Sequence, residues 1–224
     1  MNELLLIIEI ISTFSLILVA KKLFGKTGLY AWIAIASILA NIQVAKSVNM
    51  FGLETSLGNV LFASTFLVTD ILSENYGKKT ARKGVYIGLS SVIIYLIVTQ
   101  ISLLYEANSI DVASDAMNML FGLSPRICLS SVFMYFIANM ADVWLFDKLK
   151  VICKGKKLWL RNNLATIICN GGENFLFTFF AFYGIYSGND ILSIAIGTTI
   201  IELLIALCDT PFLYLSKRVK EREL

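Results

Sequence analysis

Long apolar runs alternate along this chain with short polar segments. A membrane-spanning helix needs about 20 mostly apolar residues, and seven stretches meet or approach that length. They are residues 4–20, 29–45, 57–75, 84–105, 127–147, 160–184 and 190–215. The longest gap, residues 106–126, is too short for a soluble domain, and its apolar spacing predicts a short surface helix. The pattern predicts an all-α, polytopic membrane helix bundle that forms one domain over residues 1–224.

The composition supports a membrane protein and argues against several soluble classes. Of the 224 residues, 57% are hydrophobic and 16% are charged, whereas soluble domains carry about 25% charged residues. The sequence has no His, which removes the commonest metal ligand and proton shuttle. Its four Cys are scattered without a CxxC pair. We therefore expect no metal, no cofactor and no disulfide framework, and the net charge of +3 does not indicate nucleic-acid binding.

The basic residues predict the orientation of the chain. Residues 21–28, 73–84 and 147–161, together with the C-terminal tail, hold 17 of the 19 Lys and Arg residues. Because cytoplasmic loops collect Lys and Arg, this alternation places the N-terminus outside and the C-terminus in the cytoplasm. It also supports seven spans, and thus a multi-pass protein of the inner (cytoplasmic) membrane.

Polar side chains inside the predicted spans are candidates for a binding site. An ionisable group near the bilayer centre costs about 2.5–3.5 kcal/mol on insertion scales, so it usually faces a cavity or a partner. Six carboxylates lie within spans, while the only basic residue near one is Lys46, so a ligand or bound protons are expected to compensate them. Interfacial positions are an open alternative for Asp142 and Glu9. The candidate substrate-binding residues are Asn41, Gln43, Lys46, Asp70, Asn139, Asp142, Asn170, Glu173, Glu202 and Asp209.

The sequence CNGGEN, residues 169–174, interrupts the sixth apolar run near its middle. Two adjacent glycines there suggest local unwinding, and discontinuous helices of this kind form midplane substrate sites in transporters. A packing face of small residues is the alternative, although it leaves Asn170 and Glu173 unexplained. In the seventh run, Glu202 and Asp209 are seven residues apart and therefore on one helical face. We expect the site between the second, third, sixth and seventh spans.

Residues 64–84, STFLVTDILSENYGKKTARKG, end an apolar run with two carboxylates that precede a basic cluster. The basic residues at 78–83 are expected to mark the cytoplasmic end of the third span. Asp70 lies at least one turn deeper and is expected to face a cavity. Glu74 is expected to form a boundary ion pair with Lys78 at i+4.

Sequence motifs do not support an enzyme. AKKLFGKT, residues 20–27, resembles a P-loop, but it lies between two predicted spans instead of joining a strand to a helix. Neither HExxH nor GxSxG occurs. We therefore expect no catalysis and no ATPase activity in this chain.

Several ordered stretches resemble one family of membrane transporters. FLVTDILSENYGKKTARKGVYIG, MADVWLFDKL, NGGENFLFTFFAF and DTPFLYLSKR together look like the queuosine precursor transporters. The resemblance covers residues 29–218, so residues 1–28 are interpreted as a helix added to a six-helix core. It implies import of 7-deazaguanine bases, queuine included, through a midplane site lined by carboxylates, amides and aromatic rings.

The chemistry of such a base fits these residue types. It donates from N1–H and an exocyclic amine, and it accepts at a carbonyl oxygen. A carboxylate such as Glu173 or Asp70 can accept both donors in a bidentate pair, and rings among residues 175–182 can stack on the heterocycle. The family pattern usually has Asp where this chain has Glu173, and often Lys where it has Glu202. Because Glu202 reverses that charge, we expect it to favour a ligand with an ammonium group over a neutral nitrile.

Other functions stay open at this point. The six-helix plan is similar to the substrate-binding subunits of energy-coupling factor transporters, which implies transport only with a separate ATPase module. A general purine carrier would use the same site chemistry, and a membrane enzyme or structural helical protein would bind no deazaguanine. The expected partners are thus a small 7-deazaguanine ligand, the lipid bilayer and, in the first alternative, an ATPase.

Overall fold

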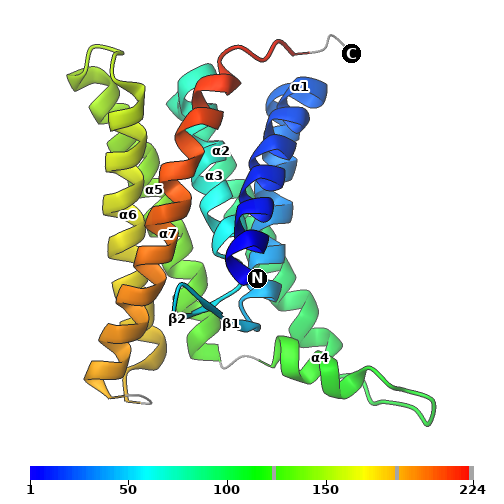
Figure 1. The fold of residues 1–224 in the computed structure, drawn as a ribbon. Coiled ribbons are helices and arrows are strands. Elements are labelled where there is room, and N and C mark those ends of the chain that lie inside the picture. Colours follow the sequence, from blue (N-terminus) through cyan, green and yellow to red (C-terminus); the bar gives the residue numbers. More distant parts are fainter. Residues whose placement is uncertain (123–124, 185–186, 222–224) are drawn as a thin grey trace.

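The protein is a helical bundle with one small β-hairpin (Figure 1). We describe residues 1–122, 125–184 and 187–221 of a computed structural model. The helices are α1 (Asn2–Gln43), α2 (Asn59–Tyr76), α3 (Lys78–Ser102), α4 (Ser114–Phe121), α5 (Pro125–Ile152), α6 (Leu158–Phe182) and α7 (Gly188–Ser216). The strands β1 (Ser47–Met50) and β2 (Leu53–Ser56) pair between α1 and α2. The prediction of a helical bundle is confirmed, with the hairpin as an addition.

Helix α1 consists of two helices that reverse direction at Gly25 (Figure 1). Gly25 has φ 56° and ψ −139°, a conformation that glycine adopts more readily than other residues. A Cβ at Gly28 would collide with the carbonyl oxygen of Ala20, although eight residues of straight helix would separate the two by about 12 Å. The two halves occupy the first two predicted spans. The predicted loop at 21–28 is instead helical on both sides of a turn at one glycine.

The hairpin replaces the loop that the apolar pattern predicts at residues 46–56. Its two turn residues, Phe51 and Gly52, both have positive φ, 52° and 78°, as a type I′ turn requires. Asn2 donates from Nδ2 to the carbonyl oxygen of Asn49 at 2.9 Å. The hairpin therefore holds the start of α1 beside the end of its second half.

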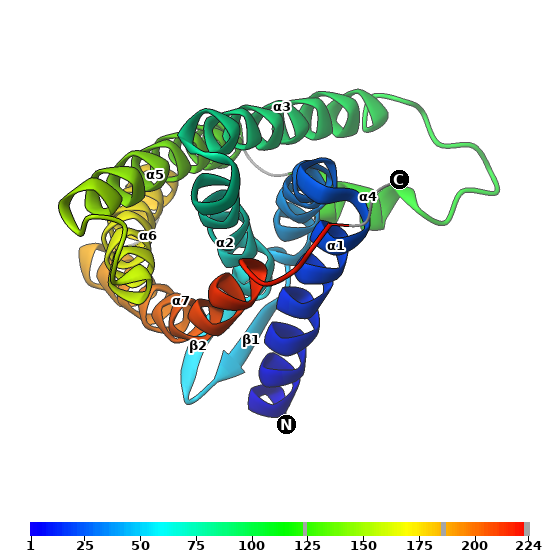
Figure 2. The ribbon, with the colours of Figure 1, turned by 90° about the horizontal axis from the view of Figure 1, so that it is seen from above.

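Helix α2 occupies the centre of the bundle (Figure 2). It packs on α1, α3, α5 and α7, and almost every residue from Asn59 to Ser73 is buried. A helix enclosed in this way has little surface to present to lipid. It can therefore carry polar side chains such as Thr69 and Asp70, both fully buried, toward its neighbours.

Four helices in the described part of the chain are long and apolar enough to cross a membrane, namely α1, α3, α5 and α7. Their exposed side chains are mostly Leu, Ile, Val and aromatic residues, which suits a lipid-facing surface. Helices α2 and α6 are less apolar because Asn, Asp, Glu and Thr interrupt them. Most of these polar side chains are buried inside the bundle.

The two ends of the bundle differ in charge. At one end, here called the basic end, α1 turns, α2, α5 and α7 finish, and α3 and α6 start (Figure 1). The opposite end, the hairpin end, carries the β-hairpin and α4. Helix α4 falls within residues 106–126, where a short helix is predicted, and Gln100 Nε2 donates to the carbonyl oxygen of Phe121 at 2.7 Å to hold it against α3.

Candidate functional site

Polar side chains line the inward face of α6 along its whole length. Buried positions recur at spacings of three and four, which is one face of a helix. The buried polar residues are Arg161, Asn162, Thr166, Asn170, Asn174 and Thr178. Helix α6 is continuous from Leu158 to Phe182, so the predicted unwinding at 169–174 is wrong.

The glycines of CNGGEN lie away from this inward face. A Cβ at Gly172 would meet no atom within 4 Å, and one at Gly171 would meet only Thr199 at 3.9 Å. Neither position therefore requires glycine for close packing in the described structure. A continuous helix keeps its backbone groups bonded, which a low-dielectric surrounding strongly favours. Of the polar residues in CNGGEN, Asn170 and Asn174 belong to the inward stripe and Glu173 is partly buried, and none of them marks a break in the helix.

Two fully buried carboxylates face each other between α2 and α5. The carboxyl groups of Asp70 and Asp142 are within hydrogen-bonding reach of each other, and none of their four oxygens has any other hydrogen-bond partner within the described ranges. Asp209 of α7 acts electrostatically on both, but its own Oδ1 accepts from Asn162 Nδ2 at 2.6 Å. Two buried carboxylates repel each other unless a proton, a cation or N–H donors lie between them. We call Asp70 and Asp142 the aspartate pair.

One turn of α6 adds unsatisfied neutral groups beside the aspartate pair. Asn170 is 1% exposed, yet neither its Nδ2 nor its Oδ1 has a partner among the described residues, and the same holds for Thr166 Oγ1. Cys169 interacts electrostatically with both aspartates, which places this turn next to them. Leaving a buried polar group unpaired costs about 1–3 kcal/mol. These atoms are therefore candidates for contacts with a ligand.

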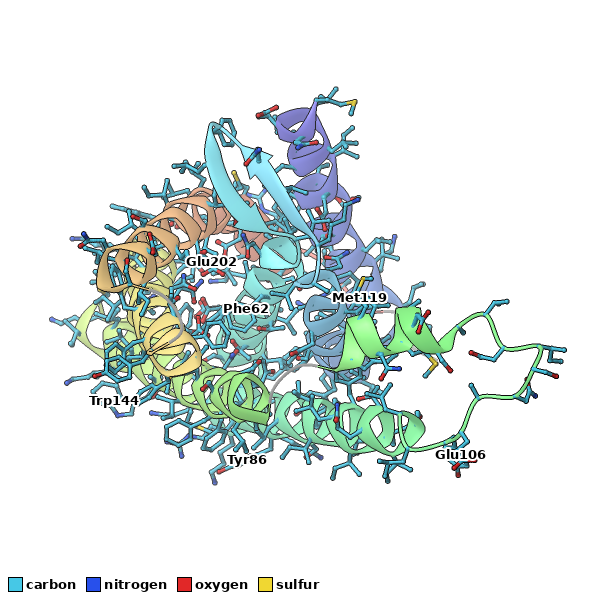
Figure 3. All side chains as sticks on the ribbon, turned by 90° about the horizontal axis from the view of Figure 1, so that it is seen from below. Phe62, Tyr86, Glu106, Met119, Trp144 and Glu202 are labelled. Carbon is cyan, nitrogen blue, oxygen red and sulfur yellow. The ribbon has the colours of Figure 1, made fainter. Side chains whose placement is uncertain are left out.

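A second pair of carboxylates lies further toward the hairpin end. Glu173 and Glu202 interact electrostatically, and Glu202 accepts from Asn174 Nδ2 at 2.7 Å. Figure 3 shows Glu202 pointing into the space enclosed by α2, α5, α6 and α7, with Phe62 of α2 directed to the same space. Seven residues of α7 separate Glu202 from Asp209, a rise of about 10 Å. Carboxylates therefore lie at two heights along these helices. The first acidic level is the aspartate pair with Asp209, and the second acidic level is Glu173 with Glu202.

Helix α2 directs aromatic rings toward this space. Phe62 and Phe66 are in edge-to-face contact, with ring centroids 5.4 Å apart. The predicted stacking rings of residues 175–182 include Phe175, Phe179 and Phe180, which are all exposed on the outside of α6. Phe177 is partly buried, and the side chain of Phe182 lies outside the described residues, so α2 supplies rings for stacking in addition to the predicted range.

Asn139 of α5 lies one turn from Asp142 and is fully buried. Its Nδ2 donates to the carbonyl oxygen of Tyr135 at 3.1 Å, and its Oδ1 accepts from Thr65 Oγ1 at 3.4 Å. It therefore borders the aspartate pair but already has partners on both sides of its amide.

The predicted residues near the end of α1 lie apart from the aspartate pair. Asn41 donates to the carbonyl oxygen of Ser37 at 2.8 Å, and Gln43 is partly buried. Lys46 is exposed in the turn before β1, near the hairpin end, whereas Asp70 lies in the half of α2 closer to the basic end. Lys46 is therefore not the cation that compensates the buried carboxylates.

Glu74 has different partners from the one predicted. It is almost completely buried, and its carboxylate binds three cations. These are Arg161 through Nη1 at 2.9 Å and Nη2 at 3.3 Å, Lys150 at 2.9 Å and Lys217 at 3.0 Å. Lys78 pairs with Asp147 of α5 at 2.9 Å. The predicted i+4 pair is wrong because the chain turns at Gly77 and Lys78 begins a new helix.

Arg161 is a candidate functional residue that the sequence pattern misses. Counting it with the basic segment 147–161 assigns it to the surface, but its side chain is fully buried in α6. Its guanidinium lies over the ring of Phe146 at 5.1 Å, and it interacts electrostatically with Asp70. Arg161, Ala165 and Cys169 are spaced four residues apart, so they lie on one face of α6. This spacing is the sequence signal that places Arg161 on the inward face.

Comparison with known proteins identifies the family. Residues 56–216 match the family described as "Putative vitamin uptake transporter". The chain belongs to this family. It is 37% identical over 207 residues to a "Probable queuosine precursor transporter" of Bacillus subtilis, covering 92% of this chain and 90% of the relative. It is 25% identical over 170 residues to the "Queuosine precursor transporter" of Escherichia coli, covering 72% and 74% of the two chains.

These relatives confirm the resemblance drawn from the sequence motifs. No solved structure matches the chain. Membership of this uptake transporter family, together with the apolar helices, makes the chain a multi-pass membrane protein. The division of the chain into residues 1–28 and 29–218 stays a prediction.

Proposed function

We propose that this transporter imports queuosine precursors, that is 7-deazaguanine bases, and binds them between α2, α5, α6 and α7. The observation that carries the proposal is the group of six buried atoms on Asp70, Asp142 and Asn170 that have no hydrogen-bond partner among the described residues beyond the contact between the two aspartates. The names of the Bacillus subtilis and Escherichia coli relatives support the choice of ligand class.

A 7-deazaguanine supplies the hydrogen-bonding groups that these residues lack. Its N1–H and exocyclic amine donate side by side, which suits the two oxygens of one carboxylate of the aspartate pair. Its carbonyl oxygen can accept from the Nδ2 of Asn170. Phe62 and Phe66 offer rings for stacking on the heterocycle. The ligand would thereby separate Asp70 from Asp142 with N–H donors.

In the proposed topology the chain crosses the inner (cytoplasmic) membrane seven times, through both halves of α1 and through α2, α3, α5, α6 and α7. The four segments that hold most of the basic residues all lie at the basic end of the bundle. The positive-inside rule then places this end, with the C-terminus, in the cytoplasm and the N-terminus outside. Import proceeds by alternating access, from the hairpin end to the basic end.

Uptake by this chain alone tests the proposal. The host is a bacterial strain that can neither make nor import the precursor bases, and the readout is queuosine in its tRNA after each base is supplied. We expect the chain to restore queuosine, while the empty vector does not. No restoration, with binding of the base by the purified protein retained, would instead support a binding subunit that needs an ATPase module. Equal binding of guanine would support a general purine carrier.

The Glu202→Gln variant is expected to change the preference among precursor bases. The second acidic level favours the ammonium of an aminomethyl or queuine ligand, and a charge-assisted hydrogen bond contributes about 1.5–3 kcal/mol. Uptake of the aminomethyl base, relative to the nitrile, should therefore fall by about tenfold. Competition between the two labelled bases measures the ratio. Glu9→Gln, in the first half of α1, should leave the ratio unchanged, and an unchanged ratio in Glu202→Gln would refute the role of this carboxylate.

A further inference from the structure

We propose that Glu74 and its three cations form the cytoplasmic gate of this transporter, and that Arg161 couples the gate to the ligand site. The four residues, Glu74, Lys150, Arg161 and Lys217, are called the Glu74 cluster. The inference rests on the proposed function in one respect, namely that the basic end faces the cytoplasm.

The Glu74 cluster ties together the ends of the four helices that enclose the site. Glu74 lies in the last turn of α2, Lys150 in the last turn of α5, Arg161 in the first turn of α6, and Lys217 directly after α7. One carboxylate thus holds α2, α5, α6 and α7 against each other. Separation of these helix ends, as release of a ligand to this side requires, must break its ion pairs.

The cluster lies directly between the site and the basic end. Glu74 follows Asp70 by one turn of α2, a rise of about 6 Å. Arg161 precedes Asn162, whose side chain binds Asp209. The side chains of Glu74 and Arg161 are 5% and 0% exposed, whereas those of Lys150 and Lys217 are 33% and 47% exposed, so a buried ion pair lies beneath two cations that reach the surface.

Arg161 lies near two carboxylates, Glu74 and Asp70. Its Nη1 and Nη2 donate to Glu74, whereas its Nε has no hydrogen-bond partner in the described part of the chain. It also interacts electrostatically with Asp70, although no hydrogen bond joins the two. Because Asp70 lies one turn of α2 from Glu74 and its oxygens have no partner beyond Asp142, it is the proposed second carboxylate site for the guanidinium.

A guanidinium resembles the edge of the proposed ligand. Both present adjacent N–H donors in one plane, and both suit bidentate binding to a carboxylate. Arg161 and the base therefore compete for the aspartate pair. Movement of Arg161 from Glu74 to the aspartate pair would displace the ligand and open the gate in the same step, which makes the guanidinium a two-state element.

Accessibility of Cys169 tests the gate without any transport measurement. Cys169 is 8% exposed and packs beside the site with Phe66 and Ala138. In a chain whose other cysteines are replaced by Ser, it is the single target for a membrane-impermeant maleimide. Inside-out vesicles expose the cytoplasmic side of the protein to the maleimide, and right-side-out vesicles expose its outer side. Labelling of the unaltered site should be slow from both.

We expect Glu74→Gln to raise labelling from the cytoplasmic face by about tenfold or more, because the remaining cations repel each other and Arg161 is free to turn to Asp70. The matched control is Asp147→Asn, which removes the ion pair with Lys78 at the same end but lies outside the cluster. It should leave the labelling rate unchanged. Arg161→Lys keeps the charge without the bidentate geometry and should give an intermediate rate.

Three results would overturn the gate. These are an unchanged rate in a folded Glu74→Gln protein, an equal increase in Asp147→Asn, or an increase confined to the outer face. If Glu74→Gln does not reach the membrane, Glu74→Asp and Lys217→Gln replace it, with increases of the same kind expected. Labelling needs no ligand, so a chain that gates in this way but imports no deazaguanine would refute the proposed function and leave the gate standing.

Discussion

Asp70→Asn is expected to abolish uptake while leaving the protein as stable as before or more stable. The substitution replaces one acceptor oxygen with an N–H₂ donor, so the carboxylate can no longer accept both donors of the base. One hydrogen bond is lost and the other, to the uncharged amide oxygen, loses its charge assistance; since a charge-assisted bond contributes about 1.5–3 kcal/mol, uptake should fall by about a hundredfold or more. The new amide can donate to Asp142, where two carboxylates now face each other. That bond should raise the free energy of unfolding by about 1 kcal/mol.

Paired measurements of uptake and of the melting temperature in detergent check this prediction. Asp209→Asn is the matched control, because Asp209 already accepts from Asn162 at 2.6 Å and should lose stability by about 1 kcal/mol. A melting temperature that falls together with uptake in Asp70→Asn would show a structural role for Asp70. Undiminished uptake would remove it from the site.

The helices of the bundle are predictable from the sequence because the bilayer imposes a simple rule on them. A span needs about 20 apolar residues and must satisfy its backbone hydrogen bonds internally. The two halves of α1, and α3, α5 and α7, follow that rule. Asp70 is also predictable, since a carboxylate inside an apolar run rarely faces lipid. Its partner Asp142 lies 72 residues away, and only the packing of α2 against α5 brings them together.

The errors arise where short-range spacing competes with contacts between helices. Glu74 and Lys78 have i+4 spacing, but the turn at Gly77 separates them. Glu74 instead binds cations from α5, from α6 and from the residue directly after α7. The Asn-Gly pair of α6 predicts a turn in a soluble protein, yet the helix continues through it. The strands of the β-hairpin are too short to appear as apolar runs in the sequence. The feature that defines the hairpin is the turn at Phe51–Gly52, where both residues have positive φ.

Arg161→Gln is expected to destabilise the protein more than substitution of either lysine of the Glu74 cluster. Arg161 is fully buried, donates twice to Glu74 and lies over the ring of Phe146. Removing one partner of a buried ion pair costs about 3–5 kcal/mol, and the loss here should lie toward the lower end because Glu74 keeps its ion pairs with Lys150 and Lys217. The loss should appear as a lower melting temperature and a lower amount of protein in the membrane.

Two comparisons separate this effect from a general loss of charge at the basic end. Lys217→Gln removes a cation whose side chain is 47% exposed, and it should cost less than about 1 kcal/mol. The double variant Glu74→Gln with Arg161→Gln removes both buried charges, so it should be more stable than Glu74→Gln alone, which leaves the buried guanidinium of Arg161 without its carboxylate. If Arg161→Gln were no less stable than Lys217→Gln, the guanidinium would not be the centre of the cluster. If the double variant lost the sum of the two single effects, Glu74 and Arg161 would act independently and the coupling between gate and site would lose its basis.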